Sequence, residues 1–144
     1  MKKQVLLLAS LFVLSMIAAQ TVQAQQSLVV NVPFDFTAGN TALPAGEYSV
    51  QKWGKDTSVL LIQCADQSAS VIIPTMAAIS SERQSESKLV FHRYGDRYFL
   101  SQVWTEGNSR GRELSKSKRE KEIAIIAQNE SRVTLSATLT ASHK

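Results

Sequence analysis

The stretch LVVNVPFDFT, Leu28 to Thr37, alternates strictly between two kinds of position. The positions of one set are all apolar: Leu28, Val30, Val32, Phe34 and Phe36. A period of two is the repeat of a β-strand with one buried face, whereas a helix repeats every 3.6 residues. Pro33 has no N–H to donate to a sheet ladder, so an edge strand or a bulge is expected there. This stretch therefore requires a sheet with a covered face.

Further short runs with strand character follow at near-regular spacing, separated by turn-rich segments. They lie at residues 47–53, 58–64, 69–79, 89–94, 97–104 and 133–140. Strands at this spacing, without alternating helices, are typical of antiparallel sandwiches and small barrels. The sequence thus predicts a mainly β domain, an antiparallel β-sandwich or small β-barrel of about seven strands, and leaves open which of the two it is.

One late α-helix is expected after the composition turns polar and charged beyond Trp104. Ser117 followed by Glu120 fits a capping box ahead of an apolar run, which predicts a helix over about residues 118–128. The run IAIIA within it could instead form a short strand. Six basic residues occur between Arg110 and Lys121, and interspersed acids favour a solvated helix face over a site for an anionic lipid headgroup or polysaccharide.

The segment FHRYGDRYFLSQVW, residues 91–104, predicts a hairpin that turns at Gly95-Asp96, a pair suited to a type II′ turn. That turn pairs Tyr94 with Arg97 and Phe91 with Leu100. Continuous alternation would then put Trp104 on the face of Phe91, and Val103 on the opposite face with His92. Tyrosine, arginine and tryptophan are frequent at binding hot spots. The candidate binding surface on this hairpin consists of His92, Tyr94, Arg97 and Trp104.

The first 24 residues have the pattern of a secretory signal peptide. Lys2 and Lys3 precede an uncharged apolar run at residues 5–19, and TVQA then predicts cleavage after Ala24. The expected mature chain, residues 25–144, is a single exported domain, periplasmic or secreted, with no stable membrane span. Removing Lys2 and Lys3 lowers the formal net charge from +4 to +2, which together with export argues against a nucleic-acid partner.

Residues that could support catalysis or metal binding are few and scattered. Cys64 is the only cysteine and follows the apolar run VLLIQ, so we expect it to be buried rather than reactive, and a pair with His92 is not favoured. GNSRG around Ser109 matches the nucleophile-elbow pattern of hydrolases, but no parallel sheet and no downstream aspartate accompany it, and the only later histidine is His143. We interpret GNSRG as a chance match in a flexible strand exit, and expect no enzyme, no cofactor and no metal site.

Two long segments, VNVPFDFTAGNTALPAGEYSV and LVFHRYGDRYFLSQVWTEGNSRGREL, carry a resemblance. They are similar to a family of small exported bacterial proteins that is uncharacterised, and the resemblance covers most of residues 30–114. It implies export and a β-fold, but no catalytic residue. Cys64 departs from the small non-cysteine residue expected before Ala65-Asp66, so a shared function of Cys64 is not implied.

These observations predict an exported, non-catalytic β-domain that is structural or binds an envelope or extracellular protein or glycan. The alternative is a small β-barrel that carries an apolar small molecule, which requires a cavity between the inward side chains.

Overall fold

The computed structural model describes residues 25–127 and 130–142. Within them lie eleven strands and one helix: β1 (Gln25–Val32), β2 (Phe36–Ala38), β3 (Thr41–Leu43), β4 (Gly46–Lys52), β5 (Val59–Cys64), β6 (Ser70–Pro74), β7 (Met76–Ile79), β8 (Ser87–Tyr94), β9 (Arg97–Trp104), β10 (Arg110–Glu113), α2 (Lys118–Ile126) and β11 (Ser131–Ser142). The mainly β class with one late helix is confirmed. The expected signal peptide lies outside the described residues.

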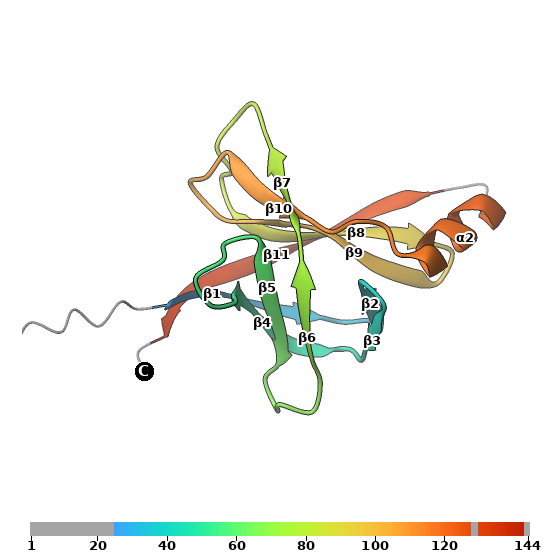
Figure 1. Cartoon of the computed structure of the whole chain (residues 1–144), viewed down its shortest axis with the longest axis horizontal. Helices are drawn as coiled ribbons and strands as arrows, with labels where there is room; N and C mark the ends of the chain where they lie inside the picture. Colours follow the sequence, from blue (N-terminus) through green and yellow to red (C-terminus); the bar gives the residue numbers. More distant parts are fainter. Residues whose placement is uncertain (1–24, 128–129, 143–144) are drawn as a thin grey trace, which may run out of the picture.

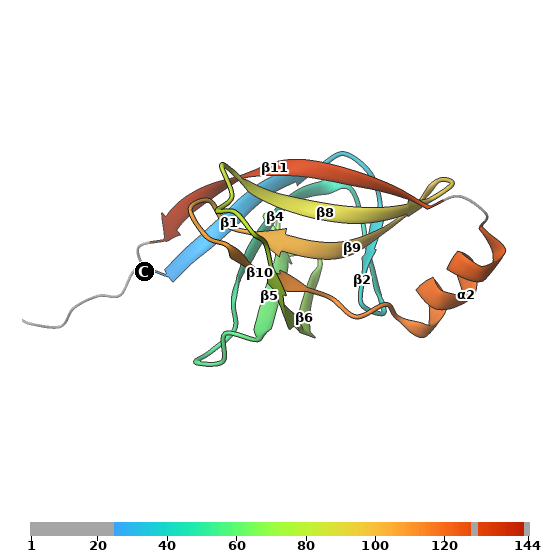
Figure 2. The ribbon, with the colours of Figure 1, turned by 90° about the horizontal axis from the view of Figure 1, so that it is seen from above.

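The strands form one sheet that curls into a nearly closed barrel (Figures 1 and 2). Its order is β3-β2-β9-β8-β11-β1-β4-β5-β6, and β10 pairs with both β9 and β7. Because β7 follows β6 after the single residue Thr75, the segment β6–β7 connects the β6 end of this order through β10 to β9 and brings the sheet back on itself. Every pairing is antiparallel except that of β2 with β9. The open choice between sandwich and barrel is thereby resolved towards a barrel-like sheet.

The strand count exceeds the expected seven because two runs are divided and short strands were not anticipated. The run 69–79 splits at Pro74-Thr75 into β6, which pairs with β5, and β7, which pairs with β10. The run 28–37 splits at residues 33–35. The expectation of an edge strand or bulge at Pro33 was wrong, since β1 ends at Val32 and has neighbours on both sides, β11 and β4. Ending the strand before Pro33 avoids a lost ladder bond.

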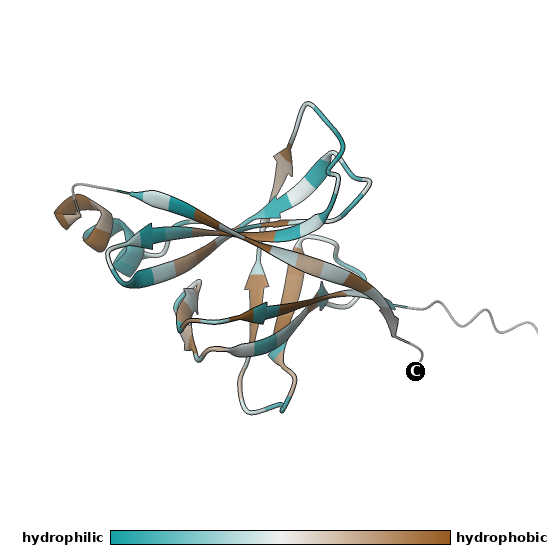
Figure 3. Ribbon diagram, turned by 180° about the vertical axis from the view of Figure 1, so that it is seen from behind, coloured by the Kyte–Doolittle hydropathy of each residue, from teal (hydrophilic) through white to brown (hydrophobic). Residues whose placement is uncertain are grey.

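The core fills the barrel with side chains from strands on opposite sides of the curled sheet. Its buried members include Leu28, Val30, Val32, Phe36, Tyr48, Val50, Leu60, Ile62, Leu89, Phe91, Leu100 and Val103. Apolar segments lie on the strands of both layers in Figure 3, with a further apolar stretch at the outer end of α2. Aromatic rings occupy the end where β1 leads into β2, with the Phe36 ring 5.1 Å from Tyr48 and 5.5 Å from Phe91. We call this the aromatic end.

The β8–β9 hairpin has the predicted register over its first four pairs, from Tyr94 with Arg97 to Phe91 with Leu100. Gly95 adopts φ +63°, as the first central position of a type II′ turn requires. Beyond Leu100 the predicted faces are wrong. A β-bulge leaves Ser101 unpaired, so Gln102 faces Val90, and the alternation of β9 is reversed. Val103 therefore joins the core, while Trp104 packs outside it with Val90 and Ala78.

Helix α2 begins at Lys118 as predicted and ends at Ile126, two residues before the expected end. The Ser117 Oγ accepts a hydrogen bond from the Glu120 backbone N–H at 3.1 Å, which is half of a capping box. The other half does not form, because the Glu120 carboxylate is the buried group of the helix and turns to the barrel. Within the described residues we find no helix with the length and hydropathy needed to cross a membrane.

Candidate functional site

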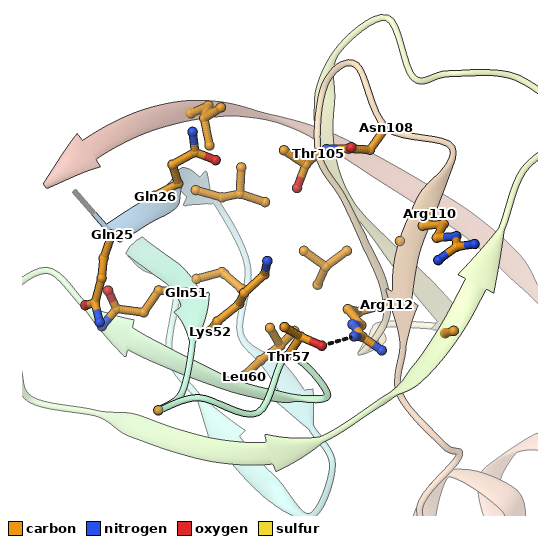
Figure 4. A pocket seen from close by; sticks show the side chains of 17 residues that line it. Gln25, Gln26, Gln51, Lys52, Thr57, Leu60, Thr105, Asn108, Arg110 and Arg112 are labelled. Atoms are coloured by element: carbon orange, nitrogen blue, oxygen red, sulfur yellow. Dashed lines mark hydrogen bonds between the residues drawn. The ribbon is translucent and has the colours of Figure 1, made fainter. Parts of the chain in front are cut away.

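A cavity of about 730 Å³ opens at the barrel end opposite the aromatic end, where β1 begins and β4 and β9 finish. We call it the mouth cavity (Figure 4). Its lining comes from Gln25, Gln26, Leu28, Val50, Gln51, Lys52, Gly54, Thr57, Leu60, Ala77, Val103, Thr105, Asn108, Arg110, Gly111, Arg112 and Leu139. A volume of this size lies within the range of about 300–1,000 Å³ typical of small-molecule sites.

The floor of the mouth cavity is apolar. Leu28, Val50, Leu60 and Val103 are buried members of the core cluster, and they face the cavity from different strands. The floor is thus the end of the buried core that faces the cavity. Side chains of this kind offer a molecule contact by dispersion and by removal of apolar surface from water.

The rim of the mouth cavity is polar and cationic. Three of the seventeen lining residues are basic (Lys52, Arg110 and Arg112), and none of the seventeen is Asp or Glu. An Arg112 Nη2–H donates to the Thr57 Oγ1 at 3.0 Å, which joins β10 to the β4–β5 loop across the opening. The ion pairs found in the described part of the chain involve other residues, His92 and Lys116 with Glu120 and Glu130.

A second group of polar side chains lies on the outer face of the β8–β9 hairpin, beneath α2. The His92 Nδ1 is 2.8 Å from the Glu120 Oε1, and the His92 Nε2 is 3.2 Å from the Ser101 Oγ. The Tyr94 hydroxyl donates to the same Glu120 oxygen at 3.2 Å. We call these four residues the His92 cluster. Ser101 follows the core residue Leu100 and so lies on the same outward face as His92, and its carbonyl accepts from the Leu114 N–H at 2.8 Å, which continues the pairing of β9 with β10.

Charged neighbours complete the His92 cluster. Glu130 lies 3.4 Å from the His92 Nε2 and, through its other oxygen, 3.4 Å from the Lys116 Nζ. Burial raises the pKa of Tyr94, although the neighbouring Lys116 opposes that rise. Burial disfavours the charge of Lys116, but contacts with Tyr94 and Glu130 outweigh it and raise the pKa of Lys116. Across residues 25–127 and 130–142, each buried side-chain nitrogen or oxygen has a hydrogen-bond partner.

The order Ser101, His92, Glu120 has the connectivity of a serine, histidine and acid triad, in which the histidine accepts from the hydroxyl and donates to the acid. A substrate, however, could not reach these residues. Ser101 and Glu120 are each only 4% exposed, and Ser101 lines neither of the two cavities described here. A nucleophile needs space beside it for the reacting carbonyl. The geometry instead fits a polar contact that holds α2 on the hairpin.

The hairpin residues predicted as a binding surface do not share one exposed face. His92 and Tyr94 are buried under α2, and Trp104 is buried against Val90 and Ala78. The sequence did not indicate that α2 covers the part of the hairpin that carries His92 and Tyr94. Arg97 is exposed and lines a second cavity of about 390 Å³.

The other residues singled out in the sequence are also located. Cys64 is buried in the core, as predicted, whereas both ring nitrogens of His92 contact other residues on the outside of the barrel. Ser109 lies just before β10, between antiparallel strands, and not at the strand-to-helix turn of an elbow. The last two residues of GNSRG, Arg110 and Gly111, belong to β10, and an added Cβ at Gly111 would lie 2.6 Å from the Trp104 ring. His143 lies outside the described residues.

Sequence reasoning missed the residues that matter most in the two sites, Lys52, Arg112 and the carboxylate of Glu120. A signal existed for Lys52, because it continues the inward positions of Tyr48 and Val50 along β4. Within the described residues, no group of three or more His, Cys, Asp or Glu side chains could hold a metal ion. Comparisons with protein-family models, curated proteins and solved structures find no match for this chain.

Proposed function

We propose that this protein is an exported, non-catalytic β-barrel domain that binds a small, mainly apolar molecule in the mouth cavity. The observation that carries the proposal is the juxtaposition of an apolar floor with a polar rim in one cavity of about 730 Å³. Concave sites with an apolar lining and a few polar groups are the usual form of small-molecule sites.

This carrier function is favoured over binding of an envelope or extracellular protein or glycan through the β8–β9 hairpin. Three of the four residues that suggested a hairpin surface are buried, and the remaining residue, Arg97, is a single exposed arginine. Hot-spot residues contribute to an interface by being available to the partner. The mouth cavity, in contrast, gathers its lining from seven strands and is open to solvent at the rim.

The proposal of a non-catalytic role draws support from the burial of the His92 cluster. Ser101→Ala is expected to leave ligand binding unchanged, because Ser101 is not part of the mouth cavity. It removes one hydrogen bond, a change worth about 1 kcal/mol of folding free energy. Loss of a hydrolytic activity in this variant, with folding and ligand binding intact, would instead identify a catalytic serine.

The test is binding of an uncharged, environment-sensitive dye such as Nile red, together with native mass spectrometry of protein from its natural culture. We expect saturable fluorescence with one site per chain, competed by the molecule that co-purifies. Ala77→Trp places an indole in the cavity from β7 and is expected to weaken dye binding at least tenfold. The matched control Ala65→Trp puts the same ring on an exposed turn outside the lining.

Two results would overturn the proposal. One is the absence of saturable dye binding to the folded chain. The other is equal loss of binding in Ala77→Trp and Ala65→Trp, which would mean that the dye binds elsewhere.

A further inference from the structure

We propose that the molecule in the mouth cavity is an amphiphile with an oxyanion head, whose head lies between Lys52 and Arg112 and whose apolar part covers the floor. This inference rests on the proposed function, since it specifies the ligand of the same cavity. The shared chemistry is a negatively charged oxygen group, either a carboxylate or a phosphate, attached to a hydrocarbon body.

Lys52 points into the barrel because of its place in the register. It pairs with Leu60 and stands two residues after Val50, and both of these residues belong to the buried core. Since successive side chains of a strand alternate between faces, Lys52 occupies the next inward position of β4. An apolar side chain there would extend the core towards the mouth, whereas a lysine ends it with a cation.

Arg112 is the corresponding position on the opposite wall. It pairs with Val103 on β9 and with Ala77 on β7, so it shares their inward face. Figure 4 shows the Lys52 side chain extending into the cavity from the side of β4, and Arg112 on the side of β10, with a hydrogen bond from Arg112 to Thr57. Two cations that face one opening from separate strands can hold the oxygens of a single head.

Within the described residues, neither Lys52 nor Arg112 forms an ion pair. The lining contains no carboxylate, and the ion pairs described for the chain lie elsewhere. Arg112 does act weakly on Asp56, whose pKa is lowered mainly by its hydrogen bonds with Ser58 and only slightly by Arg112. The Asp56 Oδ1 already accepts from both the backbone N–H and the hydroxyl of Ser58.

The donors needed for an oxyanion remain available on both side chains. The bond to Thr57 uses one of the five N–H groups of the Arg112 guanidinium. Its remaining N–H groups and the three of the Lys52 ammonium outnumber the oxygens of a carboxylate. Hydrogen bonds between charged partners are roughly twice as strong as those between neutral ones, so the head contributes to affinity and orients the molecule.

The experiment compares ligands that share one hydrocarbon chain and differ only in the head: decanoate, decyl phosphate and decan-1-ol. Each competes with Nile red for the full chain, in wild type and in the double variant Lys52→Gln and Arg112→Gln. Lys118→Gln with Arg83→Gln serves as the matched control, because both residues are exposed and outside the mouth cavity. Thermal melting verifies that each variant folds.

We expect an anionic ligand to bind wild type at least tenfold more tightly than decan-1-ol does. The preference should fall below threefold in the double variant, remain in the control, and leave the affinity for decan-1-ol unchanged. Whichever of decanoate and decyl phosphate binds more tightly identifies the head as a carboxylate or a phosphate.

The contrary outcomes separate this inference from the proposed function. Equal binding of decan-1-ol and both anions to wild type overturns the oxyanion head while leaving the apolar site intact. An anion preference that survives in the double variant places the head elsewhere and also overturns it. Failure of all three ligands and of Nile red overturns the proposed function itself.

Discussion

The two groups of charged side chains on this barrel differ in how many hydrogen-bond and charge partners the chain gives them. In the His92 cluster, the Glu120 carboxylate is buried and receives the imidazole and a tyrosine hydroxyl, with further charges from Lys116 and Glu130 close by. At the mouth cavity, Lys52 and Arg112 face an opening whose lining contains no carboxylate. Among the residues that the structure describes, the first group has its partners within the chain, whereas the second has N–H donors without a partner.

This difference separates charges that serve folding from charges that serve a partner. A buried carboxylate is tolerated only when other groups of the same chain compensate for the lost water. A cation at a rim keeps its water until a ligand replaces that water, so its removal costs the folded state little. Breaking the His92 cluster should therefore lower the free energy of unfolding, whereas breaking the pair at the mouth should lower ligand binding and leave stability nearly unchanged.

The largest loss of stability is expected for His92→Ala. The substitution leaves the Glu120 carboxylate, 4% exposed, without its closest partner. Removing one partner of a buried pair typically costs about 3–5 kcal/mol in the free energy of unfolding. Urea denaturation followed by tryptophan fluorescence measures the loss.

The control for this prediction is Glu122→Gln, which removes an exposed carboxylate from the same helix. It should change the free energy of unfolding by less than about 0.5 kcal/mol. Similar values for the two variants would show that the His92 cluster does not hold α2 on the barrel.

At the aromatic end, the buried polar group is the hydroxyl of Tyr48, which is neutral at ordinary pH. The Tyr48 hydroxyl donates to the Pro44 carbonyl at 2.6 Å, and burial raises the pKa of Tyr48 to about 12, with Cys64 adding to the rise. The folded state therefore holds this proton more tightly than the unfolded state, whose tyrosines ionise near pH 10. Its contribution to stability is complete below pH 10 and is lost between pH 10 and about 12.

Tyr48→Phe should remove that alkaline loss, which amounts to about 2–3 kcal/mol when converted from the pKa difference. Denaturation curves of wild type and variant from pH 9 to 12 measure it, and the difference between the two cancels the effect of lysine ionisation. Parallel decline of both proteins over this range would mean that Tyr48 is not the group responsible.

A smaller loss is expected for Gly111→Ala, on the strand that carries Arg112. The new Cβ would lie 2.6 Å from the Trp104 Cε3 and 2.8 Å from the Val103 carbonyl oxygen, and a backbone atom cannot rotate away. Overpacking of this kind typically costs about 1–3 kcal/mol. Thermal melting measures the loss, and Gly107→Ala is unsuitable as a control because Gly107 has φ +78°.

Ser109→Ala, just before the same strand, is a better control and should leave the melting temperature unchanged. If Gly111→Ala weakens binding of decanoate more than binding of decan-1-ol, the displaced strand has moved Arg112. An unchanged melting temperature would contradict the close packing of Trp104 on Gly111.

The smallest effect on stability is expected for Lys52→Gln. Lys52 is exposed and makes no ion pair within the described residues, so the free energy of unfolding should change by less than about 0.5 kcal/mol. Urea denaturation at low and high salt checks this value. A loss near that of His92→Ala would mean that Lys52 has a structural partner, and the contrast between the two groups would disappear.

How far the sequence could predict these features depends on the range of the contacts involved. The turn at Gly95-Asp96 and the N-cap at Ser117 are local, and both were found from neighbouring residues. The bulge at Ser101 was missed because no residue type marks it and only the packing of Trp104 and Val103 distinguishes the two registers. Glu120 was assigned to the cap because its partner His92 is 28 residues away.

At the mouth cavity, too, the local features could be predicted from the sequence and the long-range ones could not. Alternation along β4 implies that Lys52 follows Val50 on the inward face, so its direction was readable. The cavity forms because β1, β4, β9 and β10 come together at one end of the barrel. This arrangement depends on the strand order, which could not be predicted from the sequence. The basic run 110–121 was interpreted as one solvated helix face, yet Arg110 and Arg112 lie on β10 and line the cavity.

The pairing of β1 with β11 has a consequence for how the chain acquires its structure over time. Ser27 and Thr140 lie opposite each other, and their hydroxyl oxygens are 3.2 Å apart although 113 residues separate them in the chain. The first strand of the barrel can thus complete its hydrogen bonds only after the last has been synthesised. Until then one edge of β1 is unpaired and exposed to other chains. During this interval a chaperone that covers the free edge of β1 would be most effective.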